Sequence, residues 1–493
     1  MKSRYNLFLT AFFLLFISCD DYLNEDPIGL LTPEQVNLDP TVTSVRYSVS
    51  SSYQLLSGTL NIIGNWAWDD GTVTRNDFIL QDIASDDMQK KWNPDGDQAW
   101  MDQFENFSFI ASNGGLNGIW SYDYEGISRA NTAISYLTDT EMMSKLNMEA
   151  ALKNRLLGES YFLRAFYYFD LVTVFGDVPL LLRPLNSFEE AYEVAVRTAK
   201  AEVWSQIKGD LTNAKDLLPA GKYPVDTERW RASKGAVIAM QAKVALFNQS
   251  WTEVITLVAE LENLGYYQLN TNYFDSFDVT KEFADDEVIF AYDHQSSQTP
   301  QKGNGLCALL GWGFVAPETN FIQAFEANDP RLLYTVDTGS RNVNKLLGTL
   351  DGTNKGNDDS PSNRIYIRWA DVLLWKAEAL LETDKTSDAI NVINSIRQRA
   401  RNSVTANGST PPAGTLPDRN VNETSKTVVK NWLIHERRVE LGFESHRFND
   451  LKRWGIAQNV LGPRGFQNHH MLYPIPQGEI DKSGGSITQN SGY

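Results

Sequence analysis

The sequence predicts a mostly helical protein that also carries a loop-rich subdomain and a few short strands. Two observations lead to this fold class. Four long segments place apolar residues three or four positions apart, as amphipathic helices do. The segments between them are rich in Gly, Asn and Asp, which are typical of turns and loops. We therefore expect the helices to form the frame and the loops to carry the function.

The first helical segment covers residues 151–175. Leu152, Leu156, Leu163 and Phe166 recur at helical spacing there, and Gly176 follows directly as a stop signal. Apolar residues continue around most of the helix circumference. The sequence therefore predicts a long and largely buried helix.

Two pairs of helical segments share one plan. Residues 230–248 and 252–264 are separated by a short turn, and residues 365–382 and 386–401 repeat this arrangement. Small residues recur along the first segment of each pair, which allows a close approach of the second. Each pair is predicted to be a helix hairpin of the tetratricopeptide type. The repetition predicts a tetratricopeptide-like helical-repeat scaffold.

The fourth segment covers residues 425–454 and contains the charged run HERRVELGFESHRFNDLKRWG. His435 and Glu436 begin like a zinc-binding HExxH motif, but Val439 stands where the second histidine is needed. The apolar positions again follow helical spacing, so the charges share one helix. We expect them to form ion pairs that hold the C-terminal half to the repeats, and not a catalytic cluster. The residues concerned are Arg437, Arg438, Glu440, Glu444 and Arg447.

The N-terminus is typical of a bacterial lipoprotein signal. Residues 1–18 combine a basic start with an apolar run that is too short to span a bilayer. Cleavage after Ser18 leaves Cys19 as a lipidated N-terminus that anchors the protein to a membrane. Residues 19–40 are polar and contain prolines, so we expect a lipid-anchored tether. Cys307 then has no cysteine with which to form a disulfide.

Charge and motif content exclude several classes of function. The chain has 62 acidic and 44 basic side chains and a formal net charge of −18, which disfavours nucleic acid and weakly favours neutral ligands. It contains neither a GxSxG nor a GxxxxGK[ST] motif. Gly303 and Gly305 begin a dinucleotide-binding pattern that Ala308 closes, but no strand-to-helix βαβ context surrounds it. The acidic loop from Asp351 lacks the ligand spacing of an EF-hand. We expect no catalytic residue, cofactor or metal.

Several motifs occur in a consistent order along the chain. They are a lipidation motif ending at Cys19, GESYFLRAFYYFDLVTVFGDVPLL from Gly158, IRWADVLLWKAEALLE from Ile367, the charged run from His435, and LYPIPQGEI from Leu472. In these motifs and their spacing, the chain resembles the SusD/RagB family of outer-membrane nutrient-binding lipoproteins of the Bacteroidetes over nearly its whole length. Departures are small, such as Ser491 where the family often has a proline.

The resemblance implies a receptor and not an enzyme. Such a receptor is lipid-anchored and surface-exposed at the cell outer membrane, where it captures oligosaccharides and passes them to a SusC-like TonB-dependent transporter. It implies a SusD-like N-terminal helical region at 41–220. A SusD/RagB-like C-terminal region at 221–493 would include the two hairpins and the loop-rich ligand-binding part. Two alternatives remain: a peptide-binding RagB-like receptor with the same type of transporter partner, and a lipid-anchored glycan hydrolase.

Oligosaccharide binding needs aromatic faces for the sugar rings and a few polar groups for the hydroxyls. Trp92 is the first candidate because it lies in a Pro/Gly/Asp-rich segment after the strand-like FILQDI. Trp312 is flanked by glycines, which let a ligand approach the backbone closely. The full set of predicted ligand-binding residues is Trp92, Trp312, Tyr292, Gln295, Trp68 and Trp66.

The other candidates follow from strand-like patterns. Tyr292 and Gln295 lie where the strand-like VIFAY enters a loop, and Trp66 and Trp68 alternate as residues on a half-exposed strand do. Six other tryptophans lie in segments with helical spacing and are expected to pack in the core. These are Trp204, Trp230, Trp251, Trp369, Trp375 and Trp432.

Overall fold

The computed structural model describes residues 33–64, 66–91 and 97–493. Up to residue 264, its helices are α2 (Pro33–Leu38), α3 (Val42–Tyr53), α4 (Ala99–Glu105), α5 (Asn117–Thr138), α6 (Thr140–Leu146), α7 (Ala150–Phe175), α8 (Phe188–Val194), α9 (Lys200–Leu217), α10 (Lys234–Phe247) and α11 (Trp251–Leu264). The later helices are α12 (Leu306–Gly311), α13 (Thr319–Ala324), α14 (Arg331–Thr335), α15 (Trp369–Glu382), α16 (Thr386–Asn402), α17 (Lys426–Leu441), α18 (Arg447–Arg453), α19 (Ala457–Leu461) and α20 (Gln477–Lys482). None of the helices in these ranges is long and apolar enough to cross a membrane.

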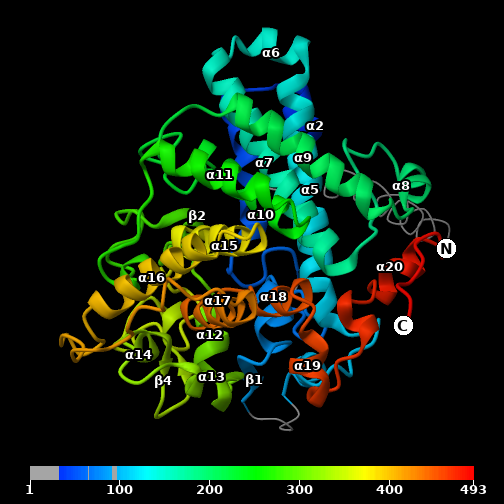
Figure 1. Ribbon diagram of the computed structural model, residues 1–493. Coiled ribbons are helices and arrows are strands. Elements are labelled where there is room, and N and C mark those ends of the chain that lie inside the picture. The colour runs from blue at the N-terminus through cyan, green and yellow to red at the C-terminus, as the bar shows by residue number, and fades with distance from the viewer. Residues whose placement is uncertain (1–32, 65, 92–96) are drawn as a thin grey trace, which may run out of the picture.

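The described strands are few and short. They are β1 (Met88–Lys90), β2 (Val288–Tyr292), β3 (Val315–Pro317), β4 (Val336–Asp337), β5 (Asn342–Val343) and β6 (Arg364–Arg368). They pair as β1 with β3, β2 with β6 and β4 with β5, each antiparallel. The predicted mostly helical fold class is therefore confirmed. In Figure 1, α6 lies at the top of the molecule, whereas β1, β4, α13 and α14 lie in its lower part.

Helix α7 is the centre of the N-terminal part. The predicted helix at 151–175 is confirmed as Ala150–Phe175, and most of its side chains are buried. It packs against both α5 and α9 along its length. Gly176 ends the helix with a φ of +78°, a backbone angle that glycine adopts readily.

The two helix hairpins are confirmed as α10 with α11 and α15 with α16. The hairpins also pack on each other through α11 and α15, so they stack as helical repeats do. The first hairpin begins later than predicted, and Trp230 lies in a turn before it. The hydroxyl of Ser233 accepts a hydrogen bond of 3.1 Å from the Ala236 N–H and caps α10, which fixes its first residue at Lys234.

Residues 365–368 are wrongly predicted as helix, because they belong to strand β6. The segment Arg364–Arg368 pairs with β2, and helix α15 begins only at Trp369. Its Ile-Tyr-Ile core is β-branched and aromatic, which suits a strand against a buried neighbour. The Trp369 N–H continues the pairing with a 2.8 Å hydrogen bond to the Glu287 carbonyl.

The single helix predicted at 425–454 is two helices, α17 and α18, separated by residues 442–446. Phe443 and Ser445 have left-handed backbone angles, with φ values of 67° and 63°. At Gly442, an added Cβ would lie 2.4 Å from the Phe321 ring, so the chain packs too closely there for any other residue. This close packing and the two left-handed residues turn the chain between the helices.

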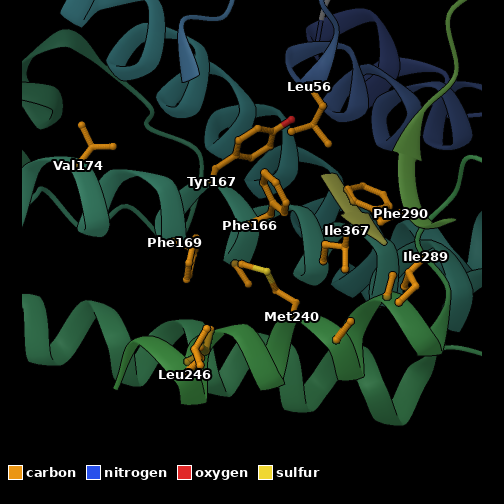
Figure 2. Close-up of a cluster of buried hydrophobic side chains, with 14 of the residues drawn as sticks. Leu56, Phe166, Tyr167, Phe169, Val174, Met240, Leu246, Ile289, Phe290 and Ile367 are labelled. Atoms are coloured by element: carbon orange, nitrogen blue, oxygen red, sulfur yellow. The ribbon is translucent and has the colours of Figure 1, made fainter. Parts of the chain in front are cut away.

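The core joins both parts of the molecule. Phe166 of α7 contacts Phe290 of the β2–β6 pair, and Phe169 points toward α10 (Figure 2). Tyr167 points the other way, toward Leu56, and its hydroxyl donates to the Ser52 carbonyl of α3. The ring of Phe290 on β2 lies edge-on to Phe162 at 4.9 Å, and Met240 of α10 is fully buried beside this group. Because one core holds both sequence regions together, residues that are far apart in sequence can lie side by side on the surface.

The charged run forms the buried ion pairs that were predicted. Glu440 accepts hydrogen bonds from Arg368 at 2.8 Å, from Arg331 at 3.0 Å and from Arg399. Arg437 binds Asp371 of α15 at 2.8 Å. These pairs hold α17 to the second hairpin. We call Glu440 with Arg331, Arg368 and Arg399 the ionic core.

Candidate functional site

Two loops that are distant in sequence meet beside helix α12. The Gly305 N–H donates a 3.0 Å hydrogen bond to the Gly58 carbonyl, and the Thr59 hydroxyl donates one of 2.8 Å to the Gly303 carbonyl. The Gly58 N–H donates to His294 Nε2 at 3.0 Å. Burial lowers the pKa of His294 to about 3, so this ring is neutral and can accept that bond. The two loops therefore form one fixed unit.

Trp312 follows helix α12 and is held against a third segment. Its N–H donates a 2.8 Å hydrogen bond to the Ala308 carbonyl, which completes the last turn of α12. A Cβ on Gly311 would lie 1.9 Å from the Gly356 amide nitrogen, and the Gly356 N–H donates to the Cys307 carbonyl at 3.1 Å. This close backbone contact fixes the position of Trp312, whose side chain stays 47% exposed.

Three aromatic rings gather at this point. The ring centroids of Trp68 and Trp312 are 5.9 Å apart, and Phe314 lies 6.2 Å from each of them. Trp68 is half-buried, Phe314 is buried, and Trp312 is the most exposed of the three. We call Trp68, Trp312 and Phe314 the aromatic platform. It brings together two of the predicted residues from loops more than two hundred positions apart.

Trp92, the first candidate, lies outside the described residues. The preceding residue, Lys91, donates its N–H to the Phe314 carbonyl at 2.9 Å, which continues the β1–β3 pairing. The strand predicted for FILQDI before this segment is wrong, because residues 79–83 form a helical turn with π-type hydrogen bonding. A short apolar run fits a buried helical turn as well as a strand, which explains the error.

Trp66 is exposed but does not lie on a strand, so that part of the prediction is wrong. Its backbone is left-handed, with a φ of 57°, and its N–H donates to Asn61 Oδ1 at 2.6 Å. The Trp68 N–H bonds the Trp66 carbonyl at 3.0 Å, so the two residues form a turn. The Trp66 side chain is 52% exposed, and its ring stacks on neither Trp68 nor Trp312 in the part of the chain described here.

Tyr292 and Gln295 lie apart from the aromatic platform. Strand β2 ends at Tyr292 as predicted, and the Tyr292 ring contacts the His294 ring at 4.8 Å. Burial raises the pKa of Tyr292, although a hydrogen bond with Ser57 opposes the shift. Gln295 is exposed, and its amide donates to Asp293 Oδ2 at 2.6 Å. The described structure gives these two residues no ring contact or hydrogen bond with the platform.

The tryptophans that were assigned to helices pack in the interior. Trp375 and Trp369 are buried, and the others are half-buried against the core: Trp204, Trp230, Trp251 and Trp432. Phe314 is the platform residue that the sequence analysis missed. Its position two residues after Trp312 in the sequence WGF was the available signal. No group of three or more potential metal-ligating side chains occurs among the described residues.

Comparison with known proteins places the chain in a family. A model described as "SusD family" matches residues 334–470, and one described as "Starch-binding associating with outer membrane" matches residues 41–246. The chain belongs to the SusD-like family. A SusD-like protein of Formosa agariphila is 27% identical to it, over 99% of this chain and 100% of that protein.

Solved SusD-like structures share the fold along most of the chain. A protein described as "Laminarin binding SusD-like protein" is 25% identical, has a TM-score of 0.72, and is matched over 92% of this chain and 98% of its own. Surface glycan-binding protein A of Bacteroides thetaiotaomicron, solved in complex with laminarihexaose, has a TM-score of 0.72 at 19% identity. That match covers 91% of this chain and 99% of the other.

Proposed function

We propose that this SusD-like protein binds oligosaccharides at the outer surface of the cell and has no catalytic role. The aromatic platform is the observation that carries the proposal. Sugar rings present apolar C–H faces that pack on exposed aromatic rings, and the exposed Trp312 offers such a ring. Three segments fix the platform before any ligand arrives, so little conformational entropy is lost on binding.

The family relationship supports the same ligand class. One solved relative is described as binding laminarin, and another was solved with laminarihexaose. Both descriptions concern those proteins, but they share the fold over nine-tenths of this chain. A neutral glucan is therefore a sensible first probe for a chain with a net charge of −18.

The proposal extends to an anchor and a partner. Cys19, outside the described residues, would carry the lipid, and a SusC-like TonB-dependent transporter would receive the bound oligosaccharide. The anchor is tested by detergent-phase partitioning of the wild type and of Cys19→Ala. A variant that still partitions with membranes contradicts the anchor. The transporter is tested by co-purification from native membranes in mild detergent, where isolation of the protein alone contradicts the partnership.

Affinity electrophoresis against a panel of neutral and acidic polysaccharides tests the ligand class directly. We expect retardation by at least one neutral glycan and no new reducing ends after incubation with it. Binding to a peptide pool in place of glycans would overturn the proposal in favour of a peptide receptor. Release of reducing ends would indicate a hydrolase.

A further inference from the structure

A surface hollow lies beside the aromatic platform. Its volume is about 390 Å³, within the range of roughly 300 to 1,000 Å³ for small-molecule sites. It is formed where α14 leads into the β4–β5 pair and where the loop at 350–355 folds over that pair. The residues that line it include Leu333, Asp337, Asn342, Leu350, Asp351 and Lys355.

The hollow adjoins the platform through Gly356, the residue that follows Lys355. A Cβ on Gly356 would lie 3.6 Å from Cδ1 of Trp312, and the preceding residue, Lys355, lines the hollow. Because consecutive Cα atoms are about 3.8 Å apart, the hollow begins about one residue from the Trp312 ring. Lys91 forms a second connection, since its ammonium donates to Asn342 Oδ1 at 3.3 Å and its N–H to the Phe314 carbonyl.

The lining combines apolar and polar surface in the way that a sugar ring requires. Leu333 and Leu350 are 47% and 40% exposed, so each presents apolar surface that solvent now covers. Lys355 is exposed, and its ammonium has neither an ion pair nor a hydrogen bond within the described part of the chain. It is therefore available to donate to a ligand.

The hollow carries charged groups of both signs, which can each pair with a sugar hydroxyl. A hydrogen bond from the Ser340 hydroxyl, helped by the Ser340 and Gly339 N–H groups and by the charge of Lys355, lowers the pKa of Asp337, so this carboxylate stays ionised. Asp351 likewise accepts from the Thr353 N–H at 2.9 Å. Lys355 also lines the hollow and Lys91 contacts Asn342 at its edge, so the hollow holds charges of both signs, and the preference for a neutral ligand rests on the net charge of −18 of the whole chain. A hydroxyl both donates and accepts, so it can pair with Lys355 and with the carboxylates.

We infer that the hollow extends the glycan-binding site and takes a neutral sugar unit of the same chain whose other units stack on the platform. Lys355 orients that unit by donating to one of its hydroxyls. This inference rests on the proposed function, because it specifies the chemical class and the minimum length of the oligosaccharide that the platform binds. The ligand is a neutral oligosaccharide long enough to pass from Trp312 over Gly356 into the hollow.

The test compares short and long oligosaccharides on the full-length protein in mild detergent. Calorimetric titration is done with the trimer and the hexamer of neutral laminari-, cello-, malto- and xylo-oligosaccharides. We expect the wild type to bind one hexamer about tenfold more tightly than its trimer, as one charge-assisted hydrogen bond allows. Lys355→Ala and Leu350→Asp should lose most of this gain and bind the trimer as the wild type does.

Lys385→Ala is the matched control. Lys385 is also exposed, but it precedes α16, whereas the hollow lies past the other end of that helix, about 25 Å away at 1.5 Å per residue. If both hollow variants keep the wild-type difference between hexamer and trimer, the inference is wrong while the proposed function stands. If no hexamer binds the wild type, the inference fails, and the proposed function fails with it only if the polysaccharide panel also shows no retardation.

Discussion

The ionic core is built from charged side chains and the aromatic platform from aromatic rings, and both kinds of side chain are common in binding sites. The two clusters differ in whether their side chains remain free to contact a ligand. Glu440 is buried and its carboxylate is taken by three arginines. Trp312 packs at one edge and keeps nearly half of its surface exposed. A cluster whose groups are satisfied within the protein stabilises the fold, whereas a ring with a free face can bind a ligand. Substitutions in each cluster test that distinction.

The largest effect is expected from Glu440→Gln. Removing this charge leaves three buried arginines without their shared carboxylate, and breaking such buried pairs costs about 3 to 5 kcal/mol of unfolding free energy. Urea unfolding measures it. Glu141→Gln is the control, because Glu141 pairs with Lys145 on the surface, and such a pair contributes about 0.2 to 0.5 kcal/mol. Equal losses in both variants would contradict the assigned role of the ionic core.

Acid should unfold the protein through the same region. Burial alone would raise the pKa of Glu444, but Arg368 and Lys345 outweigh it and lower the pKa to about 2. Its folded-state pKa lies below the ordinary value of 4.5, so its stabilising effect is present above pH 4.5 and is lost as the pH falls toward 2. We expect the unfolding free energy to fall over this window, and to fall less steeply in Glu444→Gln. Parallel pH profiles would contradict this.

Trp312→Ala should lower the affinity for glycans but not the stability, whereas Glu440→Gln should lower the stability. We expect it to weaken glycan binding by about 1 to 3 kcal/mol, using base stacking on aromatic side chains as the scale. Its melting temperature should change little, because Trp312 is largely a surface residue. Trp432→Ala, on helix α17, is the matched control and should lower the melting temperature but leave the affinity unchanged. Loss of affinity in Trp432→Ala alone would place the binding site elsewhere.

Lys452 is a buried basic residue that does not belong to the ionic core. It therefore shows what a buried charge costs when the ionic core does not stabilise it. It lies over the rings of Phe448 and Tyr473, and burial lowers its pKa to about 7. Below pH 7 the folded protein bears the full cost of burying the charge. Between pH 7 and 10.5, Lys452 is protonated in the unfolded chain but largely neutral in the folded protein, so the free energy of unfolding of the wild type rises with pH.

Lys452→Met should therefore stabilise the protein by about 0.5 to 2 kcal/mol at pH 6, with a smaller gain at pH 9. Thermal unfolding at the two pH values measures the effect. Lys452→Arg keeps a permanent charge at this position and should destabilise the protein at both. A gain for Lys452→Met that does not depend on pH would show that packing, and not charge, is responsible.

The sequence predicted the long helices better than the site. Helix α7 and both hairpins follow from local periodicity, which a helix shows wherever it packs. The break at 442–446 escaped prediction because it depends on the ring of Phe321, more than a hundred residues earlier. The platform also depends on distant contacts. Glycines next to Trp312 pointed to that residue, but nothing local indicates that Trp68 and Phe314 meet it.

The backbone contact between Gly311 and Gly356 limits how ligand preference can change. Because the two segments touch with no room for a side chain, the loop that carries Lys355 cannot be exchanged without also moving Trp312. The loop at 57–73 is joined to the other side of the same unit through Gly58 and Gly305. A designer who wished to transfer the specificity of a relative would therefore have to transplant all three segments together.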